Sequence, residues 1–112
     1  MKFETIQTSN GKLTNQMIDQ YKRDGFLYPI HILEIEEANN LRNELELLEE
    51  KYSKIKLPKP IDAYKRGPAN AVIPLVSNIA KDDRILDIVE SIIGRNILVW
   101  AAEFFIKEKK SD

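Results

Sequence analysis

Apolar residues recur at steps of three and four between residues 38 and 55, which predicts one long amphipathic helix. The apolar positions are Ala38, Leu41, Leu45, Leu48, Tyr52 and Ile55. The stripe covers fewer than three heptads, so the helix is expected to pack on its own domain rather than in a coiled coil. Pro58 and Pro60 follow and disfavour further helix.

Two shorter amphipathic helices are predicted from the residues at their ends. Thr14 is the expected N-cap of the first helix, and Gly25 ends it. Asp82 or Asp83 caps the second helix, and Gly94 closes it in the left-handed conformation that glycine tolerates best.

The remaining segments outside the two predicted strands are a loop, a short helix and a polar N-terminal segment. Residues 61–69 are predicted to be a loop that carries Arg66, and residues 71–80 are predicted to form a short helix weakened by Pro74. Residues 1–12 are polar and are predicted to be a leader.

Two segments are rich in β-forming residues. Residues 26–33 predict a short strand at a sheet edge, bent at Pro29, which lacks a backbone donor. Residues 96–107 predict a second strand.

Three charged side chains are the candidate binding residues of the chain. Strand alternation places Glu103 on one face with Ala101 and Phe105, and Lys107 ends the strand on that same face. Glu103 at this position faces either solvent or the polar interior of a barrel. Lys107 and the loop residue Arg66 are either solvated cations or ligands for a carboxylate.

Composition narrows the class of protein. A chain of 112 residues with 43% hydrophobic residues is one soluble domain or less. Its 17 basic and 18 acidic side chains nearly cancel, so neither nucleic acid nor a membrane surface is an expected partner. The longest apolar run, residues 97–102, is far below the roughly 20 residues of a membrane helix. With no signal-peptide pattern at residues 1–13, a cytoplasmic location is expected.

The sequence offers few donors for a metal. It contains one histidine, His31, and no cysteine, whereas an iron(II) oxygenase site needs two histidines and one carboxylate. The chain alone is therefore expected to hold no catalytic metal, and His31 is expected to be a packed histidine. Glutamates of the long helix alternate with Arg42 and Lys51, so they are expected to be solvated, and no residue is predicted to be catalytic.

Four segments, taken in order, carry a resemblance to a known family. Residues 13–27 read LTNQMIDQYKRDGFL, residues 84–94 RILDIVESIIG, residues 96–100 NILVW and residues 104–107 FFIK. In this order and spacing they resemble the N-terminal portion of the phytanoyl-CoA dioxygenase family, with a helix leading through Asp-Gly-Phe into a strand and later a helix–glycine–strand passage. Residues 33–48 are similar to the family's intervening helix.

The resemblance implies an α+β fold, namely the N-terminal helices and first strands of a double-stranded β-helix (jelly-roll) oxygenase with an incomplete barrel. It implies iron(II) and 2-oxoglutarate as cofactors and hydroxylation of an unactivated C–H bond in a small-molecule substrate, or halogenation as in a related group. It also implies that Lys107 and Arg66 contact 2-oxoglutarate and that Glu103 lines the cosubstrate pocket. The family's His-x-Asp ligands, which follow a few residues after the strand lysine, and its distal His and Arg have no counterpart in this sequence.

Two hypotheses about function follow. In the first, residues 1–112 are a single N-terminal part of such a dioxygenase domain, breaking off before the iron ligands and inactive alone. In the alternative, the chain is a small non-catalytic helical module. It would bind a protein partner, or associate with itself, through the unpaired strand and the apolar residues 97–106.

Overall fold

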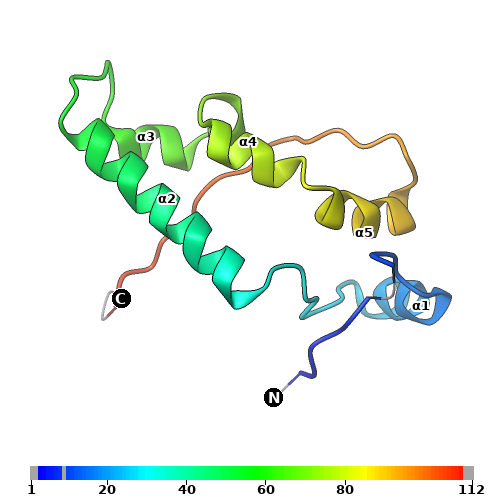
Figure 1. Ribbon diagram of the computed structural model, residues 1–112. Coiled ribbons are helices and arrows are strands. Elements are labelled where there is room, and N and C mark those ends of the chain that lie inside the picture. The colour runs from blue at the N-terminus through cyan, green and yellow to red at the C-terminus, as the bar shows by residue number, and fades with distance from the viewer. Residues whose placement is uncertain (1–2, 9, 110–112) are drawn as a thin grey trace. The chain divides into compact units, whose positions relative to one another are not determined.

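The computed structural model describes residues 3–8 and 10–109, and the elements within them are helices (Figure 1). The chain divides into two compact units, which are described separately. The first unit comprises Met1–Ala38 and Asp82–Leu98, and the second comprises Asn39–Lys81 and Val99–Asp112. In chain order the helices are α1 (Asn15–Asp24), α2 (Ile35–Ser53), α3 (Ile61–Arg66), the 3₁₀ helix η1 (Ala69–Ala71), α4 (Pro74–Ala80) and α5 (Asp83–Ile93).

Helix α1 begins and ends where the sequence predicts. The Thr14 hydroxyl accepts a hydrogen bond from the Met17 backbone N–H at 3.2 Å, which satisfies one of the free donors of the first turn. Gly25 follows the helix with φ 80°, and its N–H donates to the Tyr21 carbonyl at 2.8 Å. Both end signals are confirmed.

Helix α5 is also confirmed, and the structure selects Asp82 rather than Asp83 as its N-cap. The Asp82 carboxylate accepts from the Arg84 N–H at 2.9 Å. Gly94 ends the helix with a positive φ of 85°, but its ψ of −174° lies outside the left-handed helical region that was predicted for it. The helix contributes a buried side chain to the first unit. Its residue Ile88 is buried, and Ser91 accepts a hydrogen bond from the buried Leu13 at 3.2 Å.

Helix α2 confirms the predicted long helix but starts three residues earlier and ends two residues earlier than residues 38–55. Four of its apolar stripe residues are half-buried: Leu41, Leu45, Leu48 and Tyr52. Ile55 lies beyond the last turn and is 48% exposed. Glu36 and Glu37 occupy the first turn, where negative charge stabilises the partial positive charge of a helix N-terminus.

The second unit contains two corrections to the sequence predictions. Residues 61–69 are not a loop throughout, because they form α3 and the start of η1. Pro74 does not weaken the following helix: it is the first residue of α4, where a backbone N–H would have had no partner within the helix.

The core of the second unit is small and lies around η1 and α4. Ala69, Ile73 and Val76 are buried and pack together. Four half-buried apolar residues contact this cluster: Leu48, Leu75, Ala102 and Phe104. The core therefore depends on residues from three separated stretches of the sequence.

The predicted α+β jelly-roll fold is wrong, because the structure is mostly helical and has no sheet among the residues that it describes. Residues 26–33 make a single isolated parallel bridge, Ile6 to Ile30, with hydrogen bonds of 2.8 and 3.0 Å. Residues 96–107 form no strand. A β-forming sequence specifies an extended backbone, but a sheet also requires a partner strand to accept its hydrogen bonds. Within residues 3–8 and 10–109, residues 26–33 pair through this one bridge, and residues 96–107 bond to α3 and η1 rather than to a strand.

Helix length and composition also bear on membrane insertion. Within the part of the chain that the structure describes, no helix combines the length and apolar character needed to cross a bilayer.

Candidate functional site

An open hollow of about 750 Å³ in the second unit brings together two of the three predicted binding residues. Arg66, the last residue of α3, and Lys107, from the extended chain near the C-terminal end, both line it. Glu103, the third predicted residue, is exposed and does not line the hollow. The rest of the lining consists of Arg42, Leu45, Glu46, Glu49, Asp62, Lys65, Phe104, Phe105, Ile106 and Glu108.

Two of the four cations in this hollow are already neutralised by carboxylates. Arg42 Nε donates to Glu46 at 3.0 Å, one helical turn away on α2. Lys65 Nζ lies 2.9 Å from a Glu49 oxygen and 3.1 Å from an Asp62 oxygen.

The other two cations, Arg66 and Lys107, have no ion pair with any residue in the described part of the chain. An uncommitted guanidinium and an uncommitted ammonium at one hollow form an arrangement that suits a ligand with two negative groups.

Lys65 is the residue that the sequence analysis missed. It is 4% exposed and is the one buried charged residue of the described chain. Burial alone would lower the pKa of its ammonium, but hydrogen bonds to Glu49 and Asp62 outweigh that effect, so the pKa is raised above 10.5. The spacing of Asp62 and Lys65 gave a weak signal of a helical ion pair, whereas nothing local indicated Glu49.

Lys65 also fixes the extended chain that carries Lys107. Its carbonyl accepts a hydrogen bond from the Phe104 N–H at 2.9 Å. Two further bonds hold Ala102: its carbonyl accepts from Ala69 at 2.9 Å, and its N–H donates to Asn70 Oδ1 at 2.8 Å. Helix α3 and η1 therefore position the segment that supplies Lys107 to the hollow.

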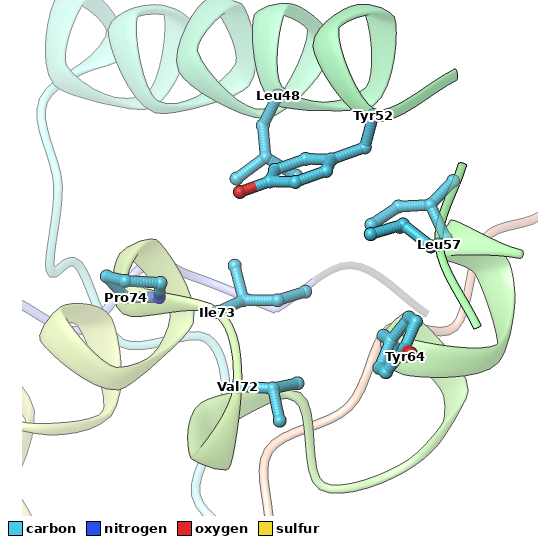
Figure 2. A pocket seen from close by; sticks show the side chains of 8 residues that line it. Leu48, Tyr52, Leu57, Tyr64, Val72, Ile73 and Pro74 are labelled. Atoms are coloured by element: carbon cyan, nitrogen blue, oxygen red, sulfur yellow. The ribbon is translucent and has the colours of Figure 1, made fainter. Parts of the chain in front are cut away.

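A second, smaller pocket in the same unit is apolar (Figure 2). It has a volume of about 210 Å³ and is lined by Leu48, Tyr52, Leu57, Ile61, Tyr64, Val72, Ile73 and Pro74. In Figure 2, Leu48 and Tyr52 reach down from α2 toward Ile73. The lining contains no charged side chain, so this pocket offers mainly apolar contact, with Tyr52 and Tyr64 as its polar residues.

Iron(II) does not fit the residues present. Across residues 3–8 and 10–109, no three His, Asp or Glu side chains lie close enough together to hold a metal ion. His31 lies 3.5 Å from Glu34, which is one imidazole and one carboxylate where the oxygenase site needs two histidines and a carboxylate. No step of iron chemistry is therefore assigned to this chain.

A cluster of charges at the start of α5 stabilises the first unit. The Arg84 guanidinium donates to Glu37 at 2.7 and 3.0 Å and to Asp82 at 2.9 and 3.0 Å. The side-chain hydrogen bond from Arg84, followed by the one from its backbone N–H, lowers the pKa of Asp82 from 3.8 to about 2. Asp82 thus combines the capping of α5 with an ion pair.

Replacing Asp82 with alanine is expected to destabilise the first unit at neutral pH, because the N-cap hydrogen bond from the Arg84 N–H is lost. The pKa of Asp82 is lower in the folded state, so its contribution is complete above pH 3.8 and is lost as the pH falls towards about 2. Urea unfolding at several pH values should therefore show the wild type and Asp82→Ala converging in acid. Asp83→Ala, at the neighbouring exposed position, is the control and should change stability much less.

The chain was compared with known protein families, curated proteins and solved structures. A scan of protein-family models found no match, and searches of curated proteins and of solved structures found none either.

Proposed function

We propose that this chain is the cosubstrate-binding N-terminal part of an iron(II)- and 2-oxoglutarate-dependent dioxygenase of the phytanoyl-CoA type. The proposal is carried by one observation, the placement of Arg66 and Lys107 at the same hollow without a carboxylate partner among the described residues. Their roles in binding 2-oxoglutarate come from the sequence resemblance. The complete enzyme would act on a small molecule, with iron donors supplied by polypeptide outside these 112 residues.

The chemistry of the ligand matches the two cations. 2-Oxoglutarate carries a carboxylate at each end, and a guanidinium binds a carboxylate with two parallel hydrogen bonds. The ammonium of Lys107 suits the second carboxylate as a point charge. Phe105 and Ile106 add apolar surface to the same lining, for the methylene groups between the two ends.

The affinity of the chain alone is expected to be low. Solvent-exposed ion pairs contribute about 0–1 kcal/mol each. The hollow also contains Glu46, Glu49, Asp62 and Glu108, which balance its four cations in formal charge. Two such pairs contribute about 2 kcal/mol at most, so we expect a Kd on the order of 10 mM for 2-oxoglutarate. No turnover is expected from these residues alone.

An NMR titration with 2-oxoglutarate tests the proposal. Arg66→Gln and Lys107→Gln should each weaken binding by roughly five-fold, the equivalent of about 1 kcal/mol. Lys59→Gln, which removes an exposed lysine that does not line the hollow, is the matched control and should bind as the wild type does. Absence of binding at roughly ten times the expected Kd, or an equal loss in the control, would contradict the proposal.

A second candidate function is the helical module that binds a protein partner. It is favoured by large apolar side chains of the second unit that remain exposed in this segment: Trp100 at 93% and Phe105 at 89%. Exposed apolar groups gathered on one segment are typical of interaction sites. Failure of the 2-oxoglutarate titration would leave this candidate as the better supported one.

A further inference from the structure

Among the described residues, the extended chain between Ala102 and Lys107 makes backbone hydrogen bonds on one of its two sides. Ala102 and Phe104 make three such bonds to the rest of the second unit. In an extended chain, successive residues direct their N–H and C=O groups to opposite sides. The backbone groups of Glu103, Phe105 and Lys107 therefore point away from this anchor, and none of them bonds to a described residue.

The side chains of this segment divide in the same alternating manner. Ala102 and Phe104 are half-buried and pack against the core of the second unit. Glu103, Phe105 and Lys107 are exposed. The segment thus has a row of backbone N–H and C=O groups without partners among the described residues, next to the exposed Phe105 ring. Another extended chain can form hydrogen bonds with such a row.

We propose that this edge pairs with the same edge of a second copy of the chain. The two segments run antiparallel, with Phe105 on the two-fold axis and Glu103 of each copy opposite the partner's Lys107. The interface is isologous, because each copy contributes the same residues to it. The pairing is carried by the second unit alone.

Charge favours this register over those centred on Glu103, Phe104 or Lys107. With Phe105 on the axis, both cross-strand pairs at the ends of the ladder join opposite charges, which stabilises paired strands. Centring the pair on Glu103 or on Lys107 would place like charges directly opposite each other. Centring it on Phe104 would leave both charges opposite uncharged residues. The same register makes Glu103, Phe105 and Lys107 the hydrogen-bonded positions, which matches their open backbone groups.

The dimer is expected to be weak, because five residues per copy lie at the low end of specific interfaces, and a Kd of roughly 100 µM is reasonable for that size. The inference does not rest on the proposed dioxygenase function. Both proposals use the Lys107 ammonium, so 2-oxoglutarate competes with the partner's Glu103 for its hydrogen-bond donors, and ligand binding is expected to weaken the dimer. Further polypeptide that supplied a strand would compete for the same edge.

Sedimentation equilibrium between roughly 10 µM and 1 mM tests the dimer, a range that brackets the expected Kd. Glu103→Lys and Lys107→Glu should each weaken association by roughly ten-fold, since each turns two attractive cross-strand pairs into repulsive ones. The double exchange, Glu103→Lys with Lys107→Glu, should restore it. A wild type that stays monomeric, single variants that dimerise normally, or a folded double variant that stays monomeric would each overturn the proposal.

Disulfide formation provides a second measurement, because the chain has no cysteine of its own. Phe105→Cys places a thiol on the two-fold axis, where the Cα atoms of a hydrogen-bonded pair are about 5.5 Å apart and can be bridged. Ala101→Cys is the control, because its two copies would lie about 27 Å apart. Equal cross-linking of both variants would refute the register. A dimer without 2-oxoglutarate binding, or the reverse, separates this inference from the proposed function.

Discussion

Ile73→Ala is expected to destabilise the second unit by about 2–3 kcal/mol and to lower its unfolding temperature by roughly 10 °C. Ile73 is 5% exposed and packs with Ala69 and Val76 in the core. Truncation removes buried methyl and methylene groups and leaves a cavity. The side chain already lines the 210 Å³ apolar pocket, so the new space opens into it and the loss should fall at the lower end for such substitutions.

Val72→Ala is the matched control for this prediction. Val72 is the preceding residue and lines the same pocket, but it is 57% exposed, so its truncation removes little buried surface. Thermal unfolding followed by circular dichroism should show a change several times smaller than for Ile73→Ala. Similar shifts for the two variants would show that the core around η1 and α4 does not control stability.

Lys65→Met has the second-largest expected effect, a loss of about 2 kcal/mol in the free energy of unfolding. Methionine keeps an apolar stem in the buried position but loses the charged hydrogen bonds to Glu49 and Asp62. Glu49 and Asp62 are 37% and 66% exposed, so water can solvate both carboxylates after the change. The loss should therefore stay below the roughly 3–5 kcal/mol found when a fully buried pair is broken.

The stabilisation that Lys65 gains from Glu49 and Asp62 is expected to decrease at high pH. The pKa of Lys65 is raised in the folded state, so its contribution is complete below pH 10.5 and is lost as the pH rises through the higher folded value. Urea unfolding should show Lys65→Met less stable than the wild type at neutral pH, with the difference shrinking in strong alkali. Lys59→Met, at an exposed lysine, is the control. A constant difference at all pH values would argue against the ion pairs as the cause.

The helix ends were the most predictable part of this molecule. Thr14, Gly25 and Gly94 were identified correctly because a cap hydrogen bond joins residues three or four apart, and the residue types that can make it are few. The long helix α2 was predictable for a similar reason, since its apolar stripe repeats over four turns.

Elements that depend on distant partners were predicted poorly. Helix α3 was taken for a loop because a segment of six residues has too few turns to show a periodic pattern. Its ion pair from Lys65 to Glu49 joins residues 16 apart in the sequence. Arg66 and Lys107 were singled out by resemblance, but their meeting at one hollow depends on how the extended chain packs on α3.

The sequence alone determined where the backbone is helical at α1, α2 and α5 and where it is extended near the C-terminal end, because local sterics and short-range hydrogen bonds govern both. Only the tertiary structure decided what the extended chain bonds to. Its β-forming residues predicted a strand of a barrel, whereas Ala102 and Phe104 bond to Ala69, Asn70 and Lys65. Side chains alternate along an extended chain whatever lies beside it, so the pattern specifies the conformation and leaves the partner open.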